Sequence, residues 1–187
     1  MEYLRWGVLG ASKFALEHLT PAIQLAKNNR FNALASGSKE KVAAFVQIEP
    51  EIKIYESYDE LLADDGTHAV YIPLPNTMHV DWTIRAIKSG KHVLCEKPIA
   101  MRAEEINELI KLRDDTGLIV AEAYMIVHHP QWQKAKEIVQ SGVLGELIQV
   151  DSVFSYNNQA DLKNIRNDSK MGGGGLPDIG VYTLGSV

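Results

Sequence analysis

The sequence has 187 residues, enough to bury one hydrophobic core and part of a second. Its hydrophobic share of 45% and charged share of 23% are typical of a globular protein and disfavour disorder. The net charge of −5, with no Lys/Arg block, excludes a nucleic-acid-binding surface, and no apolar stretch is long enough to span a bilayer. The single cysteine, Cys95, excludes an internal disulfide framework and indicates a cytoplasmic location.

The first 122 residues alternate short apolar runs with helical patterns. Strands are expected at residues 3–9, 31–35, 52–55, 69–72, 92–95 and 118–121. Helices are expected after residue 15 and at residues 39–47, 58–63, 77–89 and 103–115. The fourth strand is almost wholly apolar, as expected of a strand covered on both faces. This alternation predicts an α/β fold with a doubly wound parallel sheet, a dinucleotide-binding Rossmann domain over residues 1–122.

The pattern changes after residue 122. A helix is expected at residues 130–141, and residues 146–156 alternate like a strand of a mainly antiparallel sheet. Four glycines at 172–175 precede a short helical segment. Residues 123–187 are therefore expected to be the start of an α+β substrate and dimerisation domain. One strand and two helices cannot close a sheet core, which suggests a truncated domain.

The first predicted strand runs into a glycine turn that opens a helix, which is where a dinucleotide fingerprint belongs. Gly10 would make the tight turn, and the helix N-terminus would offer its N–H groups to a pyrophosphate. Ser12 stands where the second glycine is usual, which weakens the match, and an ordinary strand–helix turn is the alternative. The residues expected against the cofactor are Gly10, Ala11, Ser12, Lys13 and Phe14.

The end of the second predicted strand indicates which cofactor is bound. An NAD site places a carboxylate there, for the ribose 2′-hydroxyl. This sequence has hydroxyls and lysines instead, which suit the 2′-phosphate of NADP, although NAD remains possible. The alternative is a solvated helix start with a serine cap. The candidate residues are Ser36, Gly37, Ser38 and Lys41.

Two further loops follow predicted buried strands, at the sheet edge where ligands bind in such folds. The first carries Leu74, Pro75, Asn76 and His79, and the second carries Glu96 and Lys97 before Pro98. These six residues, without Pro98, are expected to lie against the cofactor. Lys97 could also set the charge of an acid/base group. The alternatives are that Asn76 or Thr77 caps the next helix with His79 packed on its first turn, and that Glu96 and Lys97 form an ordinary charge pair.

Asp178 and Tyr182 are four residues apart and therefore share one helical face. A carboxylate and a phenol that project together into a cleft can bind a substrate hydroxyl and move its proton. The alternative is a flexible glycine loop followed by a capped helix whose tyrosine packs in a core. No metal site is predicted, because the histidines show no ligand spacing with acids or cysteine.

These motifs, at residues 10–15, 69–79, 90–98 and 172–182, resemble the glucose–fructose oxidoreductase/inositol dehydrogenase (Gfo/Idh/MocA) family. Many relatives carry His where this chain has Tyr182. The tyrosine version is similar to the branch of glucose–fructose oxidoreductase, xylose dehydrogenase and dimeric dihydrodiol dehydrogenase, which commonly uses NADP(H). The chain lacks the arginine that many relatives carry at position 127, where Val127 stands, so the substrate preference is open.

The resemblance implies an NAD(P)-dependent oxidoreductase, with NADP as the expected cofactor, that acts on a sugar, a polyol or a related hydroxy or carbonyl compound. Tyr182 would be the general acid/base, Lys97 would contact the substrate and lower the pKa of Tyr182, and Asp178 would orient the sugar. A cis peptide before Pro98 and a homo-oligomer built through a C-terminal sheet are also implied. A dihydrodiol or dicarbonyl reductase and a non-catalytic NADP-binding regulator are the alternatives.

Overall fold

The computed structural model describes residues 3–157, 159–162 and 164–185. The chain forms two compact units, Met1–Glu122 and Ala123–Val187.

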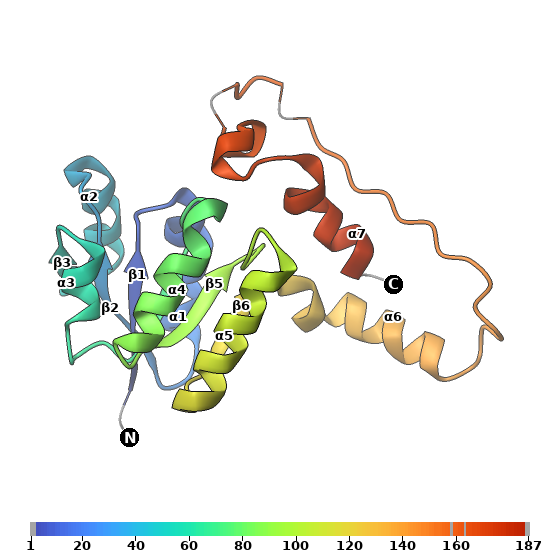
Figure 1. Ribbon diagram of the computed structural model, residues 1–187, viewed down its shortest axis with the longest axis horizontal. Coiled ribbons are helices and arrows are strands. Elements are labelled where there is room, and N and C mark those ends of the chain that lie inside the picture. Colours follow the sequence, from blue (N-terminus) through green and yellow to red (C-terminus); the bar gives the residue numbers. More distant parts are fainter. Residues whose placement is uncertain (1–2, 158, 163, 186–187) are drawn as a thin grey trace. The chain divides into compact units, whose positions relative to one another are not determined.

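The first unit is built on a six-stranded sheet of order β3-β2-β1-β4-β5-β6 (Figure 1). Its strands are β1 (Leu4–Leu9), β2 (Asn29–Ala35), β3 (Lys53–Tyr55), β4 (Ala69–Ile72), β5 (His92–Glu96) and β6 (Val120–Ala123). The pairings β1–β2, β1–β4, β2–β3 and β4–β5 are all parallel. The chain winds outward from β1 to β3 and then crosses to β4, so the doubly wound fold is confirmed.

Helices cover both faces of this sheet, with α4 and α5 on one face and α1 on the other (Figure 1). The helices are α1 (Thr20–Leu25), α2 (Lys39–Ile48), α3 (Tyr58–Leu62), α4 (His79–Lys88) and α5 (Ala103–Thr116). A π-helical turn, Ala15–Leu19, precedes α1, and the Thr20 hydroxyl donates to the Ala15 carbonyl at 3.0 Å. Pro21 has no N–H to continue the regular ladder, which explains the irregular start.

One hydrophobic cluster of the unit lies between the sheet and α3, α4 and α5. The side chains that fill it include Leu9, Val70 and Ile72 from the strands, with Leu61 from α3 and Ile87 from α4. All four residues of β4 are buried, as its almost wholly apolar sequence predicts for a central strand.

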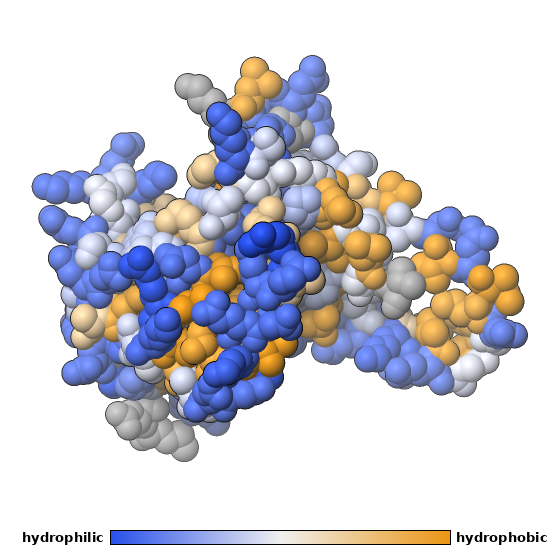
Figure 2. All heavy atoms as spheres, viewed as in Figure 1, coloured by the Kyte–Doolittle hydropathy of each residue, from blue (hydrophilic) through white to orange (hydrophobic). Residues whose placement is uncertain are grey.

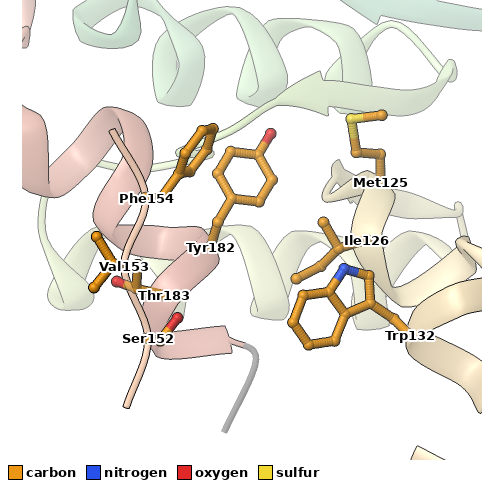
Figure 3. A pocket seen from close by; sticks show the side chains of 8 residues that line it. All are labelled: Met125, Ile126, Trp132, Ser152, Val153, Phe154, Tyr182 and Thr183. Atoms are coloured by element: carbon orange, nitrogen blue, oxygen red, sulfur yellow. The ribbon is translucent and has the colours of Figure 1, made fainter. Parts of the chain in front are cut away.

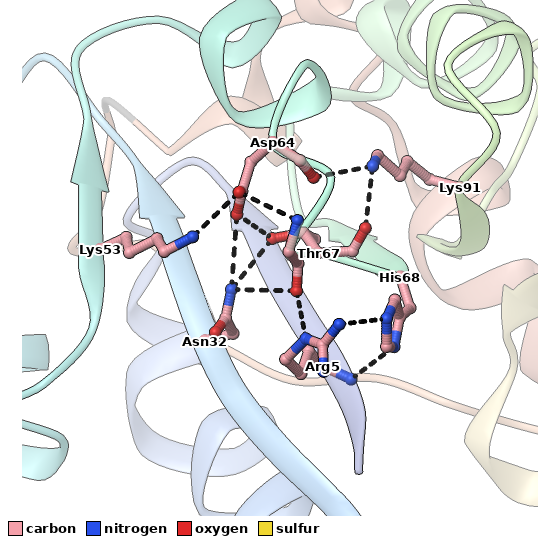
Figure 4. Close-up of polar contacts among 8 residues, drawn as sticks. Arg5, Asn32, Lys53, Asp64, Thr67, His68 and Lys91 are labelled. Carbon is pink, nitrogen blue, oxygen red and sulfur yellow. Dashed lines mark hydrogen bonds and ion pairs between the residues drawn. The ribbon is translucent and has the colours of Figure 1, made fainter. Parts of the chain in front are cut away.

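A cluster of hydrogen-bonded polar side chains lies at the end of the sheet where the parallel strands begin, its amino-terminal edge (Figure 4). The Asp64 carboxylate accepts hydrogen bonds from Lys53 Nζ at 2.9 Å and from the Thr67 hydroxyl at 2.9 Å. Lys91 is only 5% exposed, and its ammonium donates to the carbonyls of Asp64 and Thr67, each at 2.8 Å. The cluster fixes the turn that leads into β4.

The second unit is helical where it is regular. Its elements are a 3-10 turn (Met125–His128), α6 (Pro130–Gln140), two 3-10 turns (Ile165–Asn167 and Ser169–Met171), a π turn (Leu176–Gly180) and α7 (Val181–Gly185). The prediction of a strand at residues 146–156 is wrong, because this segment is extended but pairs with no other strand among the described residues. A strand needs a neighbour for its N–H and C=O groups, and the described residues of this unit contain no second strand.

Apolar side chains of this unit are exposed, and orange atoms gather over the segment that follows α6 (Figure 2). Val153 is 91% exposed and Ile148 is 86% exposed. Gly172 is the only buried residue among those described in the unit, so its described residues enclose no apolar core. None of the helices in the described residues has the length and apolar character needed to cross a membrane.

We expect the Asp64→Asn variant to lose about 2 kcal/mol of unfolding free energy at pH 7. Burial alone would raise the pKa of Asp64, but hydrogen bonds from Lys53, Thr67 and the Gly66 N–H outweigh it and lower that pKa. A lowered pKa gives stability that is complete above the unfolded value of about 3.9 and is lost as the pH falls through the folded value. Chemical unfolding at pH 7 and pH 3 should show the variant and the wild type converging in acid.

The control is Asp59→Asn, which removes a carboxylate that is 67% exposed and pairs with Arg85. We expect it to cost under about 0.5 kcal/mol. An Asp64→Asn difference that is equally large at both pH values would contradict the prediction.

Candidate functional site

The loops that follow β1, β4 and β5 meet at the carboxyl edge of the sheet in the first unit. The parallel register pairs Val8 with Tyr71 and Ile72 with Cys95, so the three strands end side by side. A Cβ atom built on Gly10 would lie 2.9 Å from Leu74 Cδ2, which places the glycine turn against the loop after β4. The sheet therefore gathers three of the predicted cofactor loops at one edge.

The glycine turn has a geometry that suits a dinucleotide. Gly10 has a φ of +100°, a conformation that L side chains rarely adopt, and its N–H donates to the Ala35 carbonyl. The Ser12 hydroxyl accepts the Ala15 N–H at 3.0 Å, so this serine caps the first helical turn. Lys13 and Phe14 are exposed at the start of that turn, and Ala11 is half-buried. A backbone turn without side-chain bulk at a helix N-terminus fits a pyrophosphate.

The serines after β2 have backbone contacts. Ser38 is the N-cap of α2 and accepts the Lys41 N–H at 3.4 Å, and the Ser36 hydroxyl accepts the Ser38 N–H at 3.2 Å. This is the capping role of the alternative interpretation. A hydroxyl that accepts a hydrogen bond still has its own O–H to donate, so the capping role leaves these serines available to a 2′-phosphate.

His79 lies beneath the loops. Its side chain is fully buried, with Nδ1 2.7 Å from the Pro98 carbonyl oxygen and Nε2 2.8 Å from the Leu74 carbonyl oxygen. It therefore packs at the first turn of α4, as the alternative interpretation describes, and joins two loops instead of facing a ligand. Leu74 belongs to the core cluster, and Asn76 begins the 3-10 turn Asn76–Met78 after Pro75.

The turn that carries Lys97 is held by side chains from neighbouring strands. Glu96 Oε1 accepts the Tyr71 hydroxyl at 2.6 Å, and Glu96 Oε2 accepts the Lys97 N–H at 3.3 Å. The Ile99 N–H donates to Glu122 Oε1 at 2.8 Å. The expected cis peptide between Lys97 and Pro98 is confirmed.

Sequence reasoning did not single out Tyr71 or Glu122. The available signal was the single phenol of the otherwise aliphatic strand β4. Burial, followed by the Glu96 charge, holds the pKa of Tyr71 far above its ordinary value, so its hydroxyl stays a donor. Burial likewise raises the pKa of the Cys95 thiol, which makes it an unreactive part of the core.

Tyr182 lines a pocket of about 380 Å³ within the second unit (Figure 3). Its ring stacks on Tyr124 with centroids 5.6 Å apart and meets Phe154 edge-on, also at 5.6 Å. The pocket is lined by Met125, Ile126, Trp132, Ser152, Val153, Phe154, Tyr182 and Thr183. The side chains that line this pocket are therefore mainly apolar.

The partners of Asp178 include Tyr156 and Arg166, which the sequence did not indicate. Its oxygens accept the Tyr156 hydroxyl at 2.8 Å and Arg166 Nε at 3.0 Å, and its side chain is 12% exposed. Burial, followed by the bond to Asp178, raises the pKa of Tyr156. Gly173 lies against the carbonyl of Ile165, so the glycine run does allow a close backbone approach.

Lys97 belongs to the first unit, and Tyr182 and Asp178 belong to the second. Their meeting at one reaction centre stays a prediction. Among the residues that the structure describes, no three His, Cys, Asp or Glu side chains are placed to hold a metal ion.

Comparison with known proteins matches each of the two units to a domain of one protein family. Residues 4–124 match the Gfo/Idh/MocA oxidoreductase family with an NAD-binding Rossmann fold, and residues 132–187 match a C-terminal domain of that family. A dTDP-3,4-didehydro-2,6-dideoxy-α-D-glucose 3-reductase of Streptomyces violaceoruber is 38% identical over 97% of this chain and 52% of its own length. An NADP(+)-dependent D-xylose 1-dehydrogenase of Haloferax volcanii is 36% identical over 98% of this chain and 56% of its own length.

A solved structure is also similar. It is a 3-ketoreductase from Actinomadura kijaniata in complex with NADP and TDP-benzene, with a TM-score of 0.82 and 32% identity. The match covers 97% of this chain and 55% of the other. The chain thus spans about half the length of the curated relatives it matches.

We expect Gly10→Ala to weaken NADPH binding about tenfold or more, which corresponds to at least about 1.4 kcal/mol. The added methyl would meet Leu74 and strain a backbone with positive φ at the proposed pyrophosphate turn. Fluorescence titration with NADPH measures the change. The matched control is Gly90→Ala, because Gly90 also has a positive φ, of +74°, but open space around it. Equal losses of affinity in the two variants would refute the assignment.

Proposed function

The chain belongs to the Gfo/Idh/MocA oxidoreductase family, and we propose that the whole protein transfers a hydride between NADP(H) and a sugar-like alcohol or ketone. The observation that carries the proposal is the fixed Glu96–Lys97–Pro98 turn at the carboxyl edge of the sheet, where β4 lies between the strand of this turn and the strand of the glycine turn. An ammonium on a rigid turn at this edge is placed where such sheets bind ligands.

The residues that would hold the cofactor come from the loops described above. The turn at Gly10 and the capped helix behind it would receive the pyrophosphate, and Ser36, Ser38 and Lys41 would receive the 2′-phosphate. The loop at Asn76 and the turn at Lys97 would border the nicotinamide, which supplies or accepts the hydride when it is bound.

The chain's own residues would handle the proton. Tyr182 would give a proton to the substrate oxygen in reduction and take it in oxidation. A free phenol has a pKa of about 10, which matches neutral pH poorly, and a nearby ammonium favours the phenolate. Lys97 would supply that ammonium. Asp178, held by Tyr156 and Arg166, would accept a hydrogen bond from a neighbouring substrate hydroxyl.

A sugar or sugar-like substrate is favoured by what the relatives act on, which includes D-xylose and a dTDP-linked ketosugar. A panel of aldoses, inositols, dTDP-ketosugars and dicarbonyls, assayed by nicotinamide absorbance, separates this class from a dicarbonyl reductase. Cofactor binding without any turnover would instead indicate a regulator. We further propose a cytoplasmic protein, because of its single cysteine, and a homo-oligomer.

We expect Lys97→Ala and Tyr182→Phe each to lower kcat of the full-length protein about a hundredfold or more. Tyr182→Phe removes the hydroxyl that transfers the proton, and Lys97→Ala removes the ammonium that favours its phenolate form. Steady-state kinetics with NADPH measures this, and the dissociation constant of NADPH should change by less than about threefold. Lys111→Ala, on the exposed face of α5 where Lys111 pairs with Asp115, is the control. Wild-type turnover in both site variants would show that the assignment is wrong.

We expect Lys41→Ala to lower kcat/KM for NADP about tenfold and to leave kcat/KM for NAD within about twofold. The reason is that only NADP carries the 2′-phosphate that this ammonium would bind. Parallel assays with both cofactors give the ratio, and Lys88→Ala, in the last turn of α4, is the control. A loss that is equal for both cofactors would argue against a 2′-phosphate site at the end of β2.

A further inference from the structure

We propose that Tyr71 is a positioning residue that fixes the turn carrying Lys97, through the carboxylate of Glu96. Its effect on turnover rests on the function proposed above. The fixing of the turn can be tested separately from that function.

The register of β4 and β5 brings the phenol to the carboxylate. Tyr71 pairs with Leu94, and Glu96 lies two residues beyond Leu94, so its side chain leaves the same face of the sheet as Tyr71. The Tyr71 hydroxyl donates to Glu96 Oε1 at 2.6 Å. This is a short bond to a charged acceptor, the stronger kind of hydrogen bond.

The same carboxylate holds the backbone of the proposed catalytic residue. Glu96 Oε2 accepts the Lys97 N–H at 3.3 Å, so one side chain joins a buried strand to the peptide that carries the ammonium. The following residues are held independently, with His79 on the Pro98 carbonyl and Glu122 on the Ile99 N–H. Without the Tyr71 hydroxyl, the Glu96 carboxylate loses its side-chain hydrogen bond to β4, and only the backbone pairing of β4 with β5 remains.

Packing alone does not account for a phenol at this position. Tyr71 is fully buried, and the other residues of β4 are Ala69, Val70 and Ile72. A buried hydroxyl lowers stability unless it is hydrogen-bonded, and a phenylalanine would fill nearly the same volume without that requirement. Within the described part of the chain, the hydrogen-bond partner of the Tyr71 hydroxyl is Glu96. This contact is the reason to assign the hydroxyl a role in the turn.

The first test is amide hydrogen exchange, measured by NMR on the full-length Tyr71→Phe variant. We expect exchange at the Lys97 amide to speed up about tenfold. Without the Tyr71 hydroxyl, the Glu96 carboxylate is no longer held in the position where it accepts the Lys97 N–H. The Ile99 amide, held by Glu122, should keep its rate and serves as an internal control. The matched control variant is Thr67→Val, which also removes a buried hydroxyl that donates to a carboxylate, at the opposite edge of the sheet.

The second test separates positioning from general stability. We expect Tyr71→Phe to lower kcat about tenfold while KM and the dissociation constant for NADPH stay within about twofold. Thr67→Val should lower the melting temperature and leave kcat unchanged. In a Glu96→Ala background the effect of Tyr71→Phe on kcat should disappear, because both residues act through one contact.

Unchanged exchange at the Lys97 amide overturns the proposal. Faster exchange with an unchanged kcat in an active enzyme overturns the positioning role, as does an equal loss of kcat in Thr67→Val. If the wild-type protein turns over no member of the substrate panel, the proposed function fails. The exchange rates then decide by themselves whether Tyr71 fixes the turn.

Discussion

The parallel pairing of β4 with β5 is the contact on which the candidate site depends. It sets Ile72 beside Cys95, so the loop after one strand and the turn after the other begin at the same height. Two further contacts at this edge use that alignment. His79 can join the Leu74 and Pro98 carbonyls only because both loops pass over its ring, and Tyr71 can reach Glu96 only because the two side chains share a face.

Many polar side chains of the candidate site form hydrogen bonds to backbone groups of the surrounding loops and helix ends. Ser12 and Ser38 cap helices, His79 joins two loops, and Glu96 receives the Lys97 N–H. These residues have the chemistry of ligand-binding groups but form hydrogen bonds within the fold. A protein that must present one ammonium at a fixed place has to satisfy the surrounding backbone groups first, because loop peptides have no ladder to pair with.

The strands and helices of the first unit could be predicted because their apolar periodicity and glycine turns are local signals. The packing of His79 on the first turn of α4 was one of two interpretations, but its two carbonyl partners could not be predicted, because they come together only when β4 and β5 pair. Tyr71 was missed for the same reason, since its acceptor Glu96 lies on another strand. The expected strand at residues 146–156 has the right alternation, but pairing needs a second strand, which sequence periodicity does not report.

Polar side chains hold turns and loops in place at both ends of the strands. At the amino edge, Asp64, Thr67 and Lys91 spend their hydrogen bonds on one another and on turn carbonyls. The candidate cofactor loops all lie at the other end of the same strands. Selection for heat tolerance and selection for a new substrate can therefore proceed on separate sets of residues, and a substitution near Asp64 should change how much protein accumulates before it changes what the protein does.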